Sequence, residues 1–184
     1  MRLIRISAGV IAALIASAVV RQAFKGGPSP KDLKPYVASG LALQFPGPPE
    51  KFEVDVPPTV RAKIESMENH QFKARNFEAA VTRVAYVATV QPNIEGALEG
   101  ALSNAASSQS MSRASNDKKP VTVSGCEGIR FTSVFRKSGQ EVEAQGVIFA
   151  KGPVLWQLFV IYLKDSAASR ETAAKMVESV QVAP

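Results

Sequence analysis

The feature that most constrains the fold is an apolar run at residues 154–163, VLWQLFVIYL, in which Gln157 is the one polar residue. The run is rich in β-branched and aromatic residues, which favours a strand. Lys151-Gly152 before it and Asp165 after it limit its length to that of a strand. Successive side chains of a strand point to opposite faces, so this strand is apolar on both faces. A strand buried on both faces needs a layer of structure on each side of its sheet.

Alternating apolar segments supply the other strands. We predict strands at residues 41–45, in the first half of 50–60, at 62–73 and 77–90, and in a meander over 119–164. Apolar residues at three- and four-residue steps predict two helices, one at 94–105 capped by Asn93 and one after Asp165 or Ser166. Residues 103–117 are rich in Ser, Asn and Ala and are predicted to fray into a loop. The predicted class is α+β: a mostly antiparallel β-sheet flanked by helices, an α-β-α sandwich, preceded by an N-terminal apolar helix.

The first 25 residues have the order of an export signal. Basic Arg2 and Arg5 precede an uncharged, mostly apolar stretch of 15 residues, 6–20. That length fits the core of a signal peptide and is short of the roughly 20 residues of a comfortable membrane span. Residues 16–18, Ala-Ser-Ala, suit a cleavage site, whereas snorkelling of Arg5 and Arg21 would extend the stretch into an uncleaved anchor. We predict a signal peptide or membrane anchor over 1–25, and an exported protein that is periplasmic or anchored in the inner membrane facing the periplasm.

Composition then divides the remaining chain. Residues 26–35 contain three Pro and two Gly, which predicts a tether over 26–38 and one globular domain over 39–184. A hydrophobic fraction of 46% excludes a disordered chain. Four of the 22 basic residues precede Gly26, which leaves 18 basic against 16 acidic residues in the rest of the chain. The excess of positive charge therefore belongs to the export segment, and we expect no nucleic-acid partner.

Several segments resemble the PsbP-like superfamily of α-β-α sandwich domains, in a bacterial exported form. The resemblance extends over about residues 41–182 and rests on FPGPPE at 45–50, ENH at 68–70, a strand ending in Tyr86, a helix near 95–102, GCEGIRF at 125–131 and Ser179-Val180. It implies an antiparallel sheet between helices and a non-enzymatic role as an accessory, assembly or binding factor. Photosynthetic relatives support photosystem II and a nuclear relative binds a small GTPase, so the fold alone does not choose a function.

Few residues carry the patterns of catalysis or metal binding. One Cys and one His cannot make an internal disulfide or a four-ligand Cys/His zinc site. We expect Cys126 to be a partly buried structural thiol, and His70 with Glu68 to form a solvated strand face or, alternatively, a two-ligand metal site. Glu141 and Glu143 share a strand face and are expected to serve solubility. We predict no catalytic residues, no metal and no cofactor.

Six basic residues cluster within 25 positions and predict a basic edge that faces anionic lipid headgroups or an acidic partner, or alternatively an ordinary charged surface: Arg113, Lys118, Lys119, Arg130, Arg136 and Lys137. Of these, the candidate binding residues are Arg130, Arg136 and Lys137. The expected function is that of a non-enzymatic exported accessory or binding protein of the cell envelope, which acts through an envelope protein or the membrane surface. The alternatives are an exported hydrolase with a polar pocket around His70, and a carrier of a small ligand or metal.

Overall fold

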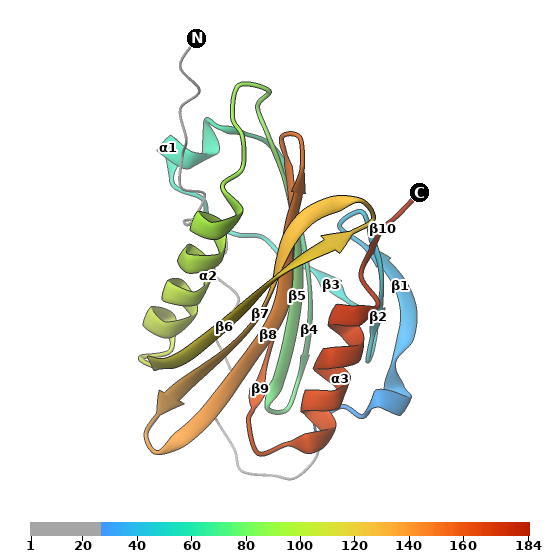
Figure 1. The fold of residues 1–184 in the computed structure, drawn as a ribbon, viewed down its shortest axis with the longest axis vertical. Coiled ribbons are helices and arrows are strands. Elements are labelled where there is room, and N and C mark those ends of the chain that lie inside the picture. The colour runs from blue at the N-terminus through green and yellow to red at the C-terminus, as the bar shows by residue number, and fades with distance from the viewer. Residues whose placement is uncertain (1–26) are drawn as a thin grey trace.

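The computed structural model describes residues 27–184, which form two antiparallel sheets (Figure 1). The large sheet has seven strands in the order β3-β4-β5-β9-β8-β7-β6, and the small sheet has the order β1-β2-β10. The large-sheet strands are β3 (Glu50–Lys51), β4 (Ile64–Ala74), β5 (Phe77–Tyr86), β6 (Ser112–Val123), β7 (Cys126–Lys137), β8 (Gln140–Lys151) and β9 (Val154–Leu163). The small-sheet strands are β1 (Lys34–Ala38), β2 (Leu41–Phe45) and β10 (Gln181–Val182). The predicted export segment and its apolar helix lie outside the described residues.

Strand β9 has the position that its sequence predicts. It lies between β5 and β8 in the middle of the large sheet, and eight of its ten residues are buried. Helix α2 (Ile94–Ser108) covers one face of this sheet and helix α3 (Ala167–Glu178) covers the other (Figure 1). Phe159 of β9 belongs to the core on the α2 side, whereas Leu158 belongs to the core on the α3 side, together with the small sheet. The α-β-α sandwich is therefore confirmed.

Both long helices begin at capping residues named by the sequence. The Asn93 side chain accepts a hydrogen bond from the Gly96 N–H at 3.0 Å, and α2 buries an apolar stripe of Ala97, Leu98, Ala101, Leu102 and Ala105. Ser166, rather than Asp165, caps α3, because its hydroxyl accepts from the Ser169 N–H at 3.3 Å. None of the helices within residues 27–184 is long and apolar enough to span a membrane.

Two polar segments differ from their predictions. Residues 103–117 are not a loop: α2 continues to Ser108, and β6 then runs from Ser112 to Val123. Strand β6 is the outer edge of the sheet and is mostly exposed on both faces, so its sequence lacks the alternation that marks a half-buried strand. The strand predicted in the first half of 50–60 is reduced to β3, because the chain leaves β4 after Phe52 and enters the short helix α1 (Pro58–Arg61) at Pro57-Pro58.

The segment predicted as a tether is also partly structured. Within residues 26–38 the chain forms the 3-10 turn η2 (Pro30–Asp32), capped by Ser29, and then strand β1. Pro35 is tolerated in β1 because this strand pairs with β2 on one side and is an edge strand. The folded part of the chain therefore begins before Ser39.

Candidate functional site

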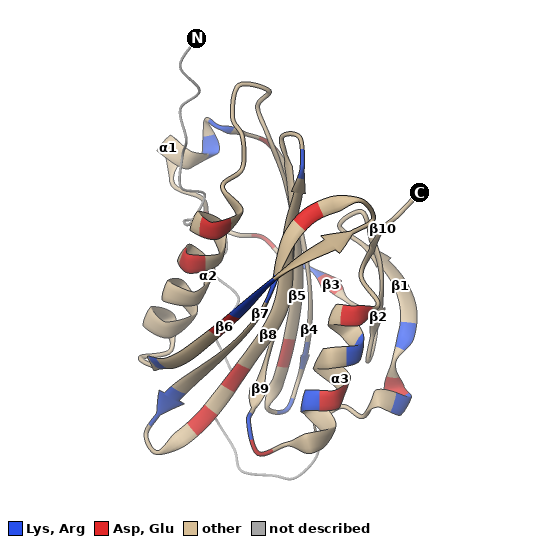
Figure 2. Cartoon of the chain, in the orientation of Figure 1, with Lys and Arg blue, Asp and Glu red and all other residues tan. Residues whose placement is uncertain are grey.

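Two of the predicted basic residues hold α2 against the edge strand. Arg113 Nη1 donates to Glu99 Oε2 at 2.8 Å, and Lys118 Nζ lies 2.9 Å from Glu95 Oε2 and 3.3 Å from Glu99 Oε1. Figure 2 shows the two acidic turns of α2 beside the blue segment of β6. The hydrogen bond from Arg113 is the main cause of a lowered pKa of Glu99. These two cations are thus paired within the molecule.

The three candidate binding residues lie on β7. Arg130 is directly paired with Lys119 of β6, and its Nη1 lies 4.0 Å from Glu178 Oε1 of α3. Arg136 stands about 20 Å further along the strand on the same face and donates from Nε to Glu141 Oε1 at 3.0 Å. Lys137 is the last residue of β7, at the hairpin to β8. The structure does not gather these residues into one site, and binding through them stays a prediction.

His70 lies beside a serine that the sequence did not identify as its neighbour. Its Nδ1 is 2.9 Å from Ser39 Oγ in the turn between β1 and β2, and its Nε2 is 4.0 Å from Glu68 Oε1. Burial lowers the pKa of His70, and the Glu68 carboxylate opposes this shift. Ser, His and Glu are the residue types of a hydrolytic triad. However, Ser39 is only 2% exposed, so a scissile carbonyl cannot reach its hydroxyl. The contact instead ties the small sheet to the large one.

Cys126 was predicted to be partly buried and is almost fully buried. It is the first residue of β7, is 5% exposed and donates from Sγ to the Ser124 carbonyl at 3.7 Å. Within residues 27–184, no three Asp, Glu, His or Cys side chains come close enough to hold a metal ion.

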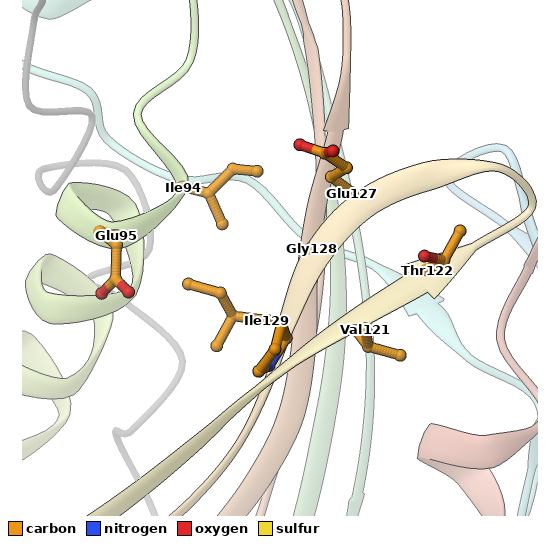
Figure 3. Close-up of a pocket in the computed structure, with 8 residues that line it drawn as sticks. Ile94, Glu95, Val121, Thr122, Glu127, Gly128 and Ile129 are labelled. Carbon is orange, nitrogen blue, oxygen red and sulfur yellow. The ribbon is translucent and has the colours of Figure 1, made fainter.

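The candidate binding site is a pocket of about 640 Å³ at the start of α2. Its lining comes from the first turn of α2 and from the paired ends of β6 and β7: Ile94, Glu95, Pro120, Val121, Thr122, Glu127, Gly128 and Ile129. Figure 3 shows Ile94 and Ile129 reaching toward each other from opposite sides of the pocket. A Cβ at Gly128 would lie 2.5 Å from the Ile148 carbonyl oxygen, so glycine lets this wall pack closely on β8.

The pocket combines an apolar interior with acidic groups. Ile94, Ile129 and Pro120 are apolar, whereas Glu95 and Glu127 contribute carboxylates. Lys118 pairs with Glu95, but Glu127 has no hydrogen-bond or ion-pair partner in the described part of the chain. One wall is the edge strand β6, whose outward N–H and C=O groups are not paired with another strand of residues 27–184. The sequence indicated GCEGIRF as a family-like segment but gave no sign that it lines a pocket.

A second polar feature lies on the α2 side of β4, β5 and β9. Asn69, Thr82 and Gln157 are directly paired across these three strands and are 6%, 4% and 2% exposed. Glu78 and Tyr86 lie on the same face of β5, four residues before and after Thr82, and are also buried. We call these five residues the inner polar band.

The inner polar band contains most of the unbonded polar atoms of the buried structure. Four of the six buried side-chain atoms without a hydrogen bond in the described residues belong to it: Asn69 Oδ1, Glu78 Oε1, Tyr86 Oη and Gln157 Nε2. Lys73 Nζ lies 3.4 Å from Glu78 Oε1, an ion pair without a well-aligned hydrogen bond. Burial raises the pKa of Glu78, and it raises the pKa of Tyr86 to about 12.

On the α3 side, the expectation that Glu143 is a solvated carboxylate is wrong. Glu143 is 6% exposed and accepts hydrogen bonds from the Tyr162 hydroxyl, from Gln145 Nε2 at 3.0 Å and from Arg170 Nε at 3.3 Å. Its sequence neighbour Glu141 remains near the surface, where it pairs with Lys164 at 2.6 Å. The two carboxylates share a strand face, but α3 covers one of them.

Comparison with known proteins gives similarity at the level of structure. No family model matches the sequence, and no curated protein matches it. Cyanobacterial PsbP (CyanoP) from Synechocystis sp. PCC 6803 has a TM-score of 0.53 at 9% identity, over 89% of this chain and 98% of that chain. LpqN, involved in cell envelope biogenesis of Mycobacterium tuberculosis, has a TM-score of 0.40 at 12% identity, over 83% of each chain.

A structure from Bacteroides thetaiotaomicron VPI-5482 has a TM-score of 0.45 at 12% identity, over 82% of this chain. This chain spans about half of that protein, 48% of its length. Of these likenesses, the one to CyanoP extends over nearly the whole of both chains. The chain therefore has a PsbP-like fold.

Proposed function

We propose that the protein is an exported, non-enzymatic accessory protein of the cell envelope that binds a polypeptide partner in the pocket between α2 and the β6–β7 edge. The pocket carries this proposal, because an apolar interior and an unpaired carboxylate meet at a free strand edge. The basic and apolar order of residues 1–25 supports export. The burial of Ser39 beside His70 disfavours the alternative of a hydrolase.

The chemistry of the pocket specifies the partner. Ile94 and Ile129 suit an apolar side chain, and the free carboxylate of Glu127 suits a Lys or Arg next to it. The outward backbone of β6 can pair with an extended segment that carries these residues. A membrane surface is a poorer match for this pocket, because the carboxylates of the pocket repel anionic lipid headgroups.

Site-specific photo-crosslinking in the producing cells tests this proposal. A benzophenone amino acid replaces Thr122 in the full chain, and Lys151, the exposed last residue of β8, is the control position. We expect Thr122 to crosslink one envelope protein through a peptide that has an apolar residue beside Lys or Arg. Ile129→Arg should abolish this crosslink. Val37→Arg, the same kind of change at an exposed hydrophobic residue on β1, should leave it intact.

Equal crosslinking in the Ile129→Arg and Val37→Arg variants would refute the pocket as the binding site. A crosslinked peptide without a basic residue would refute the proposed role of Glu127.

The cellular location is tested separately, by N-terminal sequencing of the protein from envelope fractions. A new N-terminus after Ala18 indicates a cleaved signal, and an intact N-terminus in the membrane fraction indicates an anchor. Recovery of the intact chain from the cytosol alone contradicts export. The non-enzymatic role fails if the purified protein turns over a peptide, ester or glycan and His70→Ala abolishes that turnover.

A further inference from the structure

We propose that Pro120 is a selectivity residue: it interrupts the hydrogen-bonding edge of β6, so that a polypeptide is held there only when one of its side chains also fills the pocket. This inference rests on the function proposed for the pocket and specifies how the partner is chosen. It concerns the backbone of β6, whereas the proposed function concerns the side chains that line the pocket.

Strand β6 is a long exposed edge. It has 12 residues, pairs only with β7 among the strands of residues 27–184, and is exposed from Ser112 to Pro120 except for the half-buried Asn116. The outer backbone of such an edge can pair with strands of almost any sequence, because the hydrogen bonds come from main-chain groups. A selective binding site beside this edge therefore needs a feature that excludes unrelated strands.

The β6–β7 hairpin determines which residues of β6 direct their backbone outward. Its turn is Ser124-Gly125, in which both residues have a positive φ, and the flanking residues Val123 and Cys126 are paired. The pair that flanks such a two-residue turn is hydrogen-bonded, and hydrogen-bonded and non-hydrogen-bonded pairs alternate along an antiparallel ladder. Pro120 stands three positions before Val123, so it is in a non-hydrogen-bonded pair and its nitrogen points away from β7.

The same counting agrees with a hydrogen bond at the other edge of the sheet. Ala74 and Phe77 flank the two-residue turn between β4 and β5. Asn69 stands five positions before Ala74, so its backbone should point away from β5. The Phe52 N–H donates to the Asn69 carbonyl at 3.2 Å from that side.

Pro120 removes one hydrogen bond from the middle of the outward row of β6. Lys118, Pro120 and Thr122 all direct their carbonyl groups outward, but only Lys118 and Thr122 also present an N–H. A strand that adds to β6 in either direction therefore has one carbonyl without a donor at Pro120. This loss affects every added strand, whatever its sequence.

The pocket lies at the end of β6 where an outward N–H remains. Nearer the start of the strand, the register shift between Arg113 and Ser115 and the exposed charge of Lys119 also oppose pairing. Thr122 keeps its outward N–H and lines the pocket together with Pro120. A partner can thus form a short backbone contact at Thr122, and the remainder of its affinity has to come from the pocket.

Pro120→Val tests this proposal, because it restores the N–H and keeps an apolar side chain opposite Ile129. The benzophenone at Thr122 of the full chain reports the crosslinked products in the producing cells. We expect one product that depends on Ile129 in the chain with Pro120, and additional products in Pro120→Val. The additional products should persist when Ile129→Arg is combined with Pro120→Val, because they depend on the backbone of β6 and not on the pocket. Pro120→Ala adds the same N–H with a different side chain and should give the same additional products.

Pro35 provides a matched control in the β1–β2 hairpin. It stands three positions before Ala38, which flanks the turn Ser39-Gly40, so its nitrogen also points outward from an edge strand. Pro35→Val should leave the crosslinks from Thr122 unchanged, whereas a general effect of replacing an edge proline would appear in both hairpins.

The possible results separate this inference from the function on which it rests. The same products in the same yield from the chain with Pro120, from Pro120→Val and from Pro120→Ala overturn the proposal. Additional products that disappear with Ile129→Arg, or that Pro35→Val also gives, overturn it as well. If no product depends on Ile129 in the chain with Pro120, the function proposed for the pocket fails, whereas additional products from Pro120→Val still identify Pro120 as the residue that interrupts the edge.

Discussion

The two sides of the large sheet differ in how far their buried polar groups are hydrogen-bonded. Among the described residues, four of the six buried side-chain atoms without a partner lie on the α2 side, and the other two, Arg130 Nε and Trp156 Nε1, lie on the α3 side. On the α3 side, the Glu143 carboxylate accepts three hydrogen bonds, and His70 is bonded to Ser39. On the α2 side, Asn69 Oδ1 and Gln157 Nε2 are equally buried and have no partner. The amino-acid types are similar, so the difference lies in what covers each side.

The coverage of the sheet explains this difference. Helix α3 packs on β8, β9 and the small sheet. The helix and the small sheet therefore cover the central strands of the large sheet on the α3 side. Helix α2 packs mainly on β6, β7 and β8. Near β4, the α2-side core is completed by partly buried residues of the chain around α1, including Phe52, Val56 and Val60. The half of the α2 side away from the helix is therefore covered by the chain around α1 and not by a long helix.

The largest expected loss of stability is on the α3 side of the sheet, where Glu143 accepts three hydrogen bonds. Glu143→Ala leaves Tyr162, Gln145 and Arg170 without their shared acceptor, and we expect it to lower the free energy of unfolding by about 3 kcal/mol in urea titrations. Glu141→Ala, on the same face but near the surface, is the control and should have a much smaller effect. Equal losses in the two variants would show that the α3-side network contributes nothing special.

A Thr→Val substitution should change the free energy of unfolding in opposite directions on the two sides of the sheet. Thr172 is fully buried in α3, and its hydroxyl bonds the Ala168 carbonyl at 2.8 Å, so Thr172→Val should lower stability by about 1 kcal/mol. Thr82 has no such partner, so Thr82→Val should raise stability by about 1 kcal/mol. Thermal and chemical unfolding measure both changes, and a stability loss in both variants contradicts the contrast.

A smaller effect is expected at one end of the inner polar band. Burial raises the pKa of Glu78, so the folded state favours the protonated carboxyl, and stability falls as the pH rises from about 4.5 through the folded-state pKa. Glu78→Gln stays neutral and should increase stability at pH 7 while flattening this dependence. Glu53→Gln, at an exposed position, is the control. A destabilised Glu78→Gln protein at pH 7 would mean that the Lys73 ion pair outweighs burial.

The smallest expected effect is at His70, where stability should fall as the pH decreases, opposite to the dependence expected for Glu78. Burial lowers the pKa of His70 below its ordinary value of 6.5, so the unfolded state binds the proton more readily and stability falls as the pH drops below about 6.5. His70→Gln should remove this part of the acid dependence, measured as unfolding midpoints between pH 5 and 7.5. An unchanged slope in the variant would show that His70 does not contribute to it.

Those parts of the fold that depend on strong hydrophobic patterns were predictable. The run at 154–163 specified a strand buried on both faces, and the Asn93 cap with its apolar stripe specified α2. The edge strand β1 and the first part of β6, residues 112–118, were missed because exposed strands need no alternation of apolar and polar residues. The sequence alone does not show which surfaces a later helix covers, which is why Glu143 was misjudged.

The candidate sites were predictable only in fragments. Gln157 was visible as the one polar residue in an apolar run, but its row with Asn69 and Thr82 appears only when the strand register is known. The contact between His70 and Ser39 joins residues 31 positions apart, one in the large sheet and one in the turn between β1 and β2, and no local pattern specifies it. The basic cluster was visible in the sequence, but its pairing with α2 was not, because the partners Glu95 and Glu99 precede it in a separate element.

The last part of the chain completes structure begun by the first. The Thr172 hydroxyl meets the Pro28 carbonyl across 144 positions, and β10 at the C-terminus pairs with β2. The apolar residues of α3, Ala173, Met176 and Val177, close a core that residues 38–45 help to form. A chain threaded through a membrane from its N-terminus would thus lack its final helix until about 180 residues had crossed, and would remain in an unfolded, translocation-competent state for nearly the entire passage.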